Sequence, residues 1–251
     1  MQSLLDLIYP PRCEVCDAFG PQPFCADCLA QIVRHAAPEC ERCGVLLPQT
    51  LHGRQVCPEC AETSRHFEGA RSVGIHVGTL RTAVIRFKFE NRRRLQVPLA
   101  RLLAERIERE PEPPQGLPLR QVDCLVPIPL HPRRKQWRGF DQAHLLTTEL
   151  SRMVGLPLVV GPARTRPTTP QLQLSPSERE QNVRGAFAPL GRVLEGQRIL
   201  LVDDVYTTGA TANQAARAAK AGGAIAVYVL TVSRPAPGWH PAALDLSPGD
   251  V

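Results

Sequence analysis

Short apolar runs alternate with longer amphipathic segments along most of the chain. Runs of this length, rich in Val, Ile and Leu, predict buried strands and not membrane spans. They cover residues 69–77, 122–128, 156–160, 199–202 and 225–231. Helical spacing or strong helix formers predict helices at residues 81–89, 95–109, 142–154 and 212–221, and a strand stays open as the alternative for the first of these. This alternation predicts an α/β domain with a mostly parallel sheet.

Composition narrows the class of protein. The 251 residues are enough for one sizeable α/β domain plus a small module, and 43% hydrophobic with 22% charged residues is ordinary for a soluble globular protein. No apolar run is long enough to span a membrane. The first residues include Asp6 and lack the basic region of a secretory signal, so we expect a cytoplasmic protein. The net charge of +6 is compatible with a nucleic-acid or polyphosphate partner without establishing one.

Eight of the nine cysteines form four CxxC pairs in the first quarter of the chain. The pairs are Cys13 and Cys16, Cys25 and Cys28, Cys40 and Cys43, and Cys57 and Cys60. Eight thiolates complete two tetrahedral Zn²⁺ sites. We weigh zinc above disulfides, which a reducing cytosol disfavours, and above a redox centre, which needs one such motif and not four. With sulfur at all four positions, the metals are predicted to be structural; sequential and cross-braced pairing of the motifs both stay open.

The sequence also predicts the environment of the ninth cysteine and the bounds of the domains. Cys124 lies inside an apolar run and is predicted to be a buried core thiol. We expect a double zinc ribbon at residues 1–65, the α/β domain at residues 66–234 and a flexible tail at residues 235–251. A polar stretch between residues 164 and 187 predicts a long loop, which we interpret as a lid, with a disordered insertion as the alternative.

The most specific chemistry lies in residues 198–211, RILLVDDVYTTGAT. Asp203 and Asp204 end a predicted strand, and a polar loop then leads into a helix. A helix N-terminus binds phosphate, Gly209 allows close backbone approach, and three threonines supply hydroxyl donors. The loop has no Lys and no GxxxxGK[ST] motif, which argues against a nucleoside-triphosphate site. Two carboxylates beside a phosphate site predict a phosphorylated sugar whose hydroxyls bind the acids; the alternative is a buried strand that ends in a solvated acid pair.

Two basic segments accompany this loop. Residues 81–94 and 133–138 are rich in Arg and Lys. The first is either a solvated face or a phosphate-contacting patch for nucleic acid. The second follows a strand, and in an open α/β sheet it would meet an anion bound at the carboxyl edge, with ordinary surface charge as the alternative.

The motifs resemble a known family. Residues 201–211, LVDDVYTTGAT, resemble the phosphoribosyl-pyrophosphate (PRPP) motif of type I phosphoribosyltransferases. Residues 126–146, VPIPLHPRRKQWRGFDQAHLL, resemble the PVPLH…RGFNQ segment of the ComF family, and the four CxxC pairs are typical of its long form. Asp141 stands where that family usually has Asn, which predicts a weaker anion contact there.

The resemblance implies a type I phosphoribosyltransferase fold, PRPP with Mg²⁺ as ligand, and a role for each motif. The implied catalytic pair on the ribose hydroxyls is Asp203 and Asp204. The implied 5-phosphate loop is Val205, Tyr206, Thr207, Thr208, Gly209, Ala210 and Thr211. The implied pyrophosphate loop is Pro127, Ile128, Pro129, Leu130, His131, Arg133, Arg134 and Arg138. The implied lid residues are Arg164, Arg166, Thr168, Gln171, Arg179 and Asn182.

Two functions follow from the resemblance. The first is an enzyme that transfers the phosphoribosyl group to an acceptor that the sequence does not name. The second is a non-catalytic single-stranded-DNA-binding protein of natural competence that uses the PRPP site for regulation. The expected partners are PRPP or another phosphorylated ribose, single-stranded DNA, the competence helicase machinery and a second copy of the chain.

Overall fold

A four-stranded parallel sheet forms the centre of the computed structural model, which describes residues 10–35, 38–48, 55–113, 116–166 and 182–236. Its strand order is β1 (Gly69–Ile75), β6 (Ala226–Arg234), β5 (Arg198–Val205) and β2 (Cys124–Pro127). The inner pair is in register with Leu201 opposite Val229. The mostly parallel α/β sheet is confirmed, and inner strands buried on both faces explain their continuous apolar sequence.

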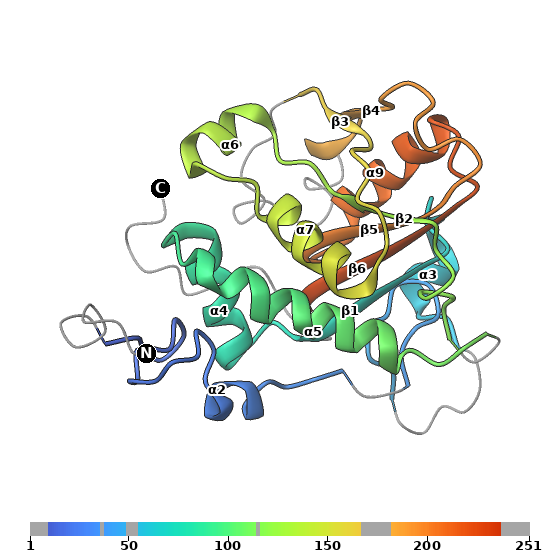
Figure 1. Ribbon diagram of the computed structural model, residues 1–251. Coiled ribbons are helices and arrows are strands. Elements are labelled where there is room, and N and C mark those ends of the chain that lie inside the picture. Colours follow the sequence, from blue (N-terminus) through green and yellow to red (C-terminus); the bar gives the residue numbers. More distant parts are fainter. Residues whose placement is uncertain (1–9, 36–37, 49–54, 114–115, 167–181, 237–251) are drawn as a thin grey trace.

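Helices cover both faces of this sheet (Figure 1). One face packs against α4 (Gly78–Phe89), α5 (Gln96–Arg109) and α7 (Gln142–Val154), and η1 (Arg93–Leu95) joins the first two of these. The other face packs against α9 (Ala210–Ala221) and the second half of the cysteine-rich module. Leu200 and Val202 point to the first face and Ile199 and Leu201 to the second, as the two-residue period of a strand requires.

The cysteine-rich module is small and contains two short helices, α2 (Ala26–Ala30) and α3 (Pro58–Glu62). Its backbone binds the outer edge of β1. Ala70 donates to the carbonyl of Arg42 at 2.7 Å, and Ile75 donates to the carbonyl of Val33 at 2.8 Å.

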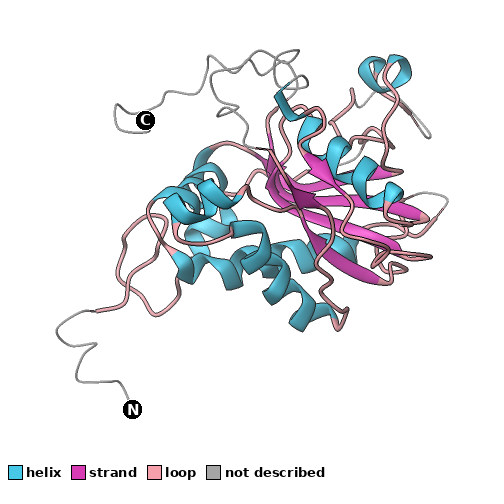
Figure 2. Cartoon of the chain, turned by 90° about the horizontal axis from the view of Figure 1, so that it is seen from above, coloured by secondary structure: helices cyan, strands magenta, loops and turns pink. Residues whose placement is uncertain are grey.

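Figure 2 shows the sheet from above, with helices on either side. No helix within the described ranges is long and apolar enough to cross a bilayer.

Several predicted elements have different bounds. The segment at 81–89 is a helix, as preferred, and begins at Gly78. Residues 156–160 were expected to form a strand, which is wrong, because they make only an isolated bridge between Leu158 and Leu125. Pro157 lacks the N–H that a longer ladder needs. The stretch after β2 was expected to be a loop, but Pro132–Arg138 forms helix α6.

Sequence signals for α6 were present. Pro132 is its first residue, the His131 side chain accepts a hydrogen bond from the Arg133 N–H, and Gly139 ends it at φ 78°. The ends of the expected long loop pair as two antiparallel strands, β3 (Ala163–Arg164) and β4 (Phe187–Ala188). The intervening residues 167–181, and residues 237–251 of the expected tail, lie outside the described part of the chain.

Candidate functional site

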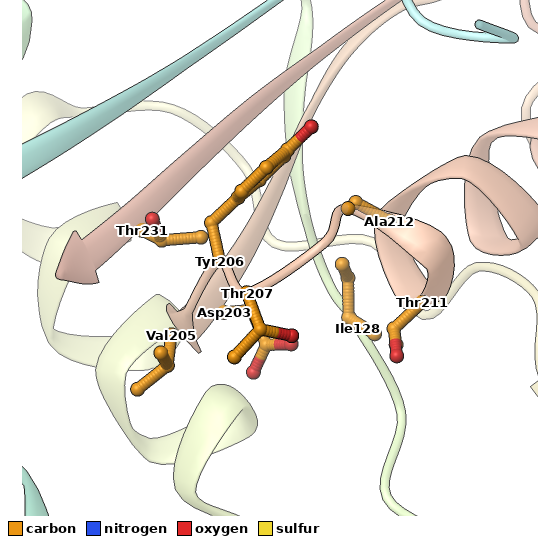
Figure 3. Close-up of a pocket in the computed structure, with 9 residues that line it drawn as sticks. Ile128, Asp203, Val205, Tyr206, Thr207, Thr211, Ala212 and Thr231 are labelled. Carbon is orange, nitrogen blue, oxygen red and sulfur yellow. The ribbon is translucent and has the colours of Figure 1, made fainter. Parts of the chain in front are cut away.

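A pocket lies at the carboxyl edge of the sheet, where β5 gives way to the loop before α9 (Figure 3). In Figure 3, Asp203 and Thr207 point to one side of this loop and Tyr206 points to the other. The lining residues are Ile128, Asp203, Val205, Tyr206, Thr207, Gly209, Thr211, Ala212 and Thr231. Most of the predicted phosphate-loop residues therefore meet one of the two predicted acids and one residue of the loop after β2.

Asp204 is the more deeply held acid, with 3% of its surface exposed. Its Oδ1 atom lies 2.8 Å from the Lys88 Nζ atom of α4. Burial alone would raise the pKa of Asp204, but Lys88, and then Arg138, lower it below its usual value. Its Oδ2 atom is buried and has no hydrogen-bond partner among the described residues. One oxygen of this buried carboxylate is thus left without a partner within the described residues.

Asp203 lies beside the pocket and is half-buried. Its Oδ1 atom accepts a hydrogen bond from the Asp204 N–H at 2.8 Å. Burial, and then the charge of Asp204, raise the pKa of Asp203 well above its usual value. The pair therefore combines a carboxylate with a group that holds a proton readily, so it can both accept and donate hydrogen bonds to a ligand.

The loop after the acid pair turns sharply at Gly209, whose φ is +77°. Gly209 caps α9, and the Ala210 N–H points to the Thr208 hydroxyl at 3.4 Å. The N–H groups of the first turn of an α-helix have no partner within the helix. Thr211 and Ala212 of that turn line the pocket, so the helix directs its positive end toward any anion held there.

Basic side chains approach the same edge from α6 and β3. Burial lowers the pKa of Arg138, although Asp204 and Asp203 act in the opposite direction. Burial, and then Arg134, lower the pKa of Arg164 to about 10. Arg138 donates to Gln142 at 2.8 Å, and its Nε atom has no partner among the described residues. Positive charge thus faces the acid pair.

Other predicted site residues lie elsewhere or have structural contacts. Arg133 is exposed on α6. Arg166 donates to the carbonyls of Asn182 and Arg184 at 3.0 and 2.8 Å. Thr168, Gln171 and Arg179 lie outside the described residues. A weakened anion contact was expected at Asp141; its two oxygens accept from the backbone N–H groups of His144 and Leu130, so its carboxylate caps α7 and fixes the loop after β2.

The eight paired cysteines gather into two groups of four, Cys13, Cys16, Cys25 and Cys28, and Cys40, Cys43, Cys57 and Cys60. Within each group the sulfur atoms lie within 4.8 Å of one another. Four thiolates bound to one zinc at about 2.3 Å lie about 3.8 Å apart. Two of the observed separations are 3.8 Å (Cys16 to Cys25) and 3.7 Å (Cys43 to Cys57).

Backbone N–H groups also point at these sulfurs. The Cys13 sulfur accepts from Val15 and Cys25 at 3.4 Å, and the Cys40 sulfur accepts from Cys57 at 3.3 Å. Such bonds stabilise thiolates, so both groups fit structural Zn²⁺ and the sequential pairing is the correct one. Cys124 is buried in the core, as predicted.

Comparisons with known proteins agree with this architecture. The profile of the double zinc ribbon domain matches residues 4–64. Competence protein F of Haemophilus influenzae is 32% identical over 76% of this chain and 81% of its own length. DNA utilization protein YhgH of Salmonella typhi is 32% identical over 91% of this chain and 99% of its own. The chain belongs to the ComF family.

Among solved structures, the glutamine PRPP amidotransferase from Bacillus subtilis, complexed with ADP and GMP, aligns with 59% of this ComF chain. The alignment covers 30% of the amidotransferase chain, at 18% identity and a TM-score of 0.39.

Several site residues of this ComF protein were missed by sequence reasoning. In the sequence, Lys88 is only one member of a basic run. His76 follows β1 and lies 2.8 Å from the Ser233 hydroxyl; burial, and then Lys88, lower its pKa to about 4. Thr231 of β6 lines the pocket. No local motif marks these residues, because the sheet brings together strands that lie far apart in the sequence.

The basic run at 81–94 has a role that differs from both predicted alternatives, a solvated face and a phosphate-contacting patch. Arg86 pairs with Asp17 at 2.7 Å, Arg92 pairs with Glu14 at 3.1 Å, and Arg94 also approaches Glu14. These arginines connect α4 and η1 to the first cysteine group. The charges of three residues that could have bound nucleic acid are thus largely balanced by acids of the ComF chain itself.

Proposed function

We propose that this ComF protein binds PRPP with Mg²⁺ at the carboxyl edge of its sheet and transfers the phosphoribosyl group. The observation that carries the proposal is the Asp203–Asp204 pair beside the N-terminus of α9. An anion site and hydroxyl acceptors next to each other suit a ribose 5-phosphate. We also propose the domain division at residues 65 and 234.

Each part of the ligand has a counterpart in the site. The 5-phosphate would accept hydrogen bonds from the loop at residues 205–211 and the first turn of α9. The ribose hydroxyls would donate to Asp203, which lines the pocket, and to the Oδ2 atom of Asp204, which is buried and has no partner among the described residues. The pyrophosphate would face Arg138 and the positive charge at Arg164. Mg²⁺ prefers oxygen ligands, and when bound it would neutralise the pyrophosphate.

This arrangement also suits the chemistry of the transfer. As the bond between C1 of the ribose and pyrophosphate breaks, the electron pair leaves with the pyrophosphate and positive charge develops on the sugar ring. The ionised member of the acid pair would stabilise that charge, and the arginines would stabilise the leaving group. The protein would contribute position and electrostatics, while the acceptor supplies the nucleophile.

Calorimetry with PRPP and Mg²⁺ tests the proposal. Asp203→Asn combined with Asp204→Asn should weaken binding at least about 10-fold, since charged hydrogen bonds contribute about 1.5–3 kcal/mol each. Asp123→Asn is the control, because Asp123 also accepts a backbone N–H, from Arg198 at 2.7 Å, but lies at the amino end of β5. Unchanged PRPP binding by the double variant would remove the acid pair from the site.

A second candidate function, binding of single-stranded DNA, rests on exposed aromatic residues beside the basic segments. Trp137 is 71% exposed and Phe89 is 42% exposed, with ring centroids 6.5 Å apart. The Arg138 guanidinium lies 4.8 Å from the centre of the Phe89 ring. Aromatic rings interleaved with arginines are typical of single-strand binding surfaces, and some relatives are named DNA utilization protein.

Trp137→Ala tests this candidate. If bases stack on the indole, affinity for a single-stranded oligonucleotide should fall about 10-fold, and wild-type affinity should decrease steeply with salt. Phe19→Ala is the matched control, because Phe19 is 67% exposed and lies under Arg12, far along the chain from α6. Equal losses in the two variants, or no salt dependence, would contradict a specific platform at Trp137.

A further inference from the structure

The second cysteine group (Cys40, Cys43, Cys57 and Cys60) lies directly behind the phosphate loop. Tyr206 of that loop is 4% exposed and packs edge-on against Phe67. The Arg234 guanidinium lies 4.9 Å from the centre of the Tyr206 ring, and its Nη1 atom donates to the carbonyl of Cys43. One side chain therefore contacts both a zinc-binding residue and a residue of the loop.

A second connection runs through Arg65, the last residue of the proposed zinc ribbon. Its Nη1 atom donates to the carbonyl of Thr208 at 3.5 Å, and its Nη2 atom binds the Glu59 carboxylate. Glu59 lies between Cys57 and Cys60 on α3. The next residue, His66, donates its N–H to the Asn213 side chain of α9 at 2.6 Å. The ribbon thus holds both the loop and the first turns of the helix.

Close packing makes the loop sensitive to Tyr206. A Cβ atom at Gly209 would lie 2.2 Å from the Tyr206 hydroxyl oxygen, so Gly209 rests against that ring. The hydroxyl is buried and has no hydrogen-bond partner among the described residues. The backbone N–H of Tyr206 donates to the carbonyl of Ser233 at 2.9 Å, but its ring is positioned by packing against Phe67 and Arg234 and not by a hydrogen bond of its hydroxyl.

We propose that the second zinc site and the phosphate loop are energetically coupled, with Arg234 and Arg65 as the positioning residues that join them. The proposal rests on the proposed function, because the loop is taken to bind a phosphorylated ribose. Metal in the second site would hold the loop in its binding conformation. Since coupling between two sites is reciprocal, a phosphate ligand should in turn slow the loss of that metal. The ion pairs beside the first site run instead to α4 and to the residues around η1.

Zinc release to a chromogenic chelator tests the coupling in the full chain. We expect saturating ribose 5-phosphate to slow the release of one of the two zinc ions at least about 5-fold. Arg234→Gln should abolish this protection. Arg42→Gln is the matched control, because Arg42 also donates to the carbonyl of a zinc-binding residue, Cys60 at 3.3 Å, but is exposed and, within the described part of the chain, makes no hydrogen bond or ion pair with the loop. It should retain the protection.

Hydrogen exchange of amides 206–211 tests the same link without a ligand. Exchange should be at least about 5-fold faster in Arg234→Gln than in wild type, and unchanged in Arg42→Gln. Identical exchange in the two variants would overturn the coupling, as would equal zinc release with and without bound ribose 5-phosphate in wild type. The wild-type comparison decides the question if Arg234→Gln does not fold. Failure of ribose 5-phosphate to bind at all, measured by calorimetry, would instead contradict the proposed function.

Discussion

Lys88 and Asp204 form an ion pair that is largely buried. The two side chains are 18% and 5% exposed, whereas those of Lys220 and Glu68, which also pair at 2.8 Å, are 37% and 36% exposed. Removing one partner of a buried pair leaves an uncompensated charge, while an exposed pair contributes little. The two lysines therefore allow a controlled test of the charge balance at the site.

Lys88→Met should lower the free energy of unfolding at pH 7.5 by about 3 kcal/mol, and Lys220→Met by less than about 1 kcal/mol. In wild type, the lowered pKa of Asp204 adds stability that is present above about pH 4 and is lost as the pH falls through the folded value. Without Lys88 that pKa rises, so the loss of stability should be larger at pH 7.5 than at pH 5. Urea unfolding of wild type and Lys88→Met at both pH values measures this loss of stability. A loss that does not depend on pH would contradict the role of charge.

The strand, loop and helix around Gly209 form the element that shapes the pocket. Gly209→Ala introduces a left-handed alanine and a clash with Tyr206. Gly155→Ala, at φ +70° with no atom within 4 Å, carries only the backbone cost of about 1–2 kcal/mol. Gly209→Ala should destabilise the protein more than Gly155→Ala and abolish phosphate binding. Chemical denaturation with calorimetry checks both effects, and equal behaviour of the two variants would show that the loop has room for a side chain.

How far the sequence predicts such elements depends on whether their cause is local. The strand at 199–202 and the CxxC motifs carry their signals within a few residues, and both predictions are confirmed, whereas the helix expected from residue 212 begins at Ala210, directly after Gly209. Lys88 reaches Asp204 only because α4 packs on the sheet, so no local pattern could reveal it. Residues 156–160 look like a strand but have a proline where the ladder needs a donor. The arginines of the basic run likewise pair with Glu14 and Asp17 only because the zinc ribbon packs beside them, so the sequence alone does not predict these pairs.

At the scale of the whole molecule, buried charges join the ribbon to the α/β domain. Glu39 of the ribbon lies 2.8 Å from Arg106 and 3.3 Å from Arg71, and Glu110 lies 2.8 Å from Arg71. His35 adds a further bond to Glu39 at 2.9 Å. Side chains from the ribbon, β1 and the end of α5 therefore share one network, and loss of any one charge leaves others unbalanced.

Glu110→Gln should lower the free energy of unfolding by about 3 kcal/mol, because Glu110 is 3% exposed and holds Arg71 and Arg106. Glu112→Gln, which affects an exposed pair with Arg120, should have little effect. The denaturant concentration at the midpoint of unfolding, measured for both variants in excess zinc, provides the comparison. Similar midpoints for both variants would mean that the network does not secure the ribbon.

The backbone bonds between the ribbon and β1 have a consequence for how the chain survives synthesis. They occupy N–H and C=O groups that would otherwise form an open sheet margin, the kind of surface on which chains stack into aggregates. Because small cysteine-rich modules of this kind do not fold without their metal, a newly made chain would lack this cover until zinc is bound. Cellular metal supply would then determine how much of the protein stays out of inclusion bodies, before any ligand is encountered.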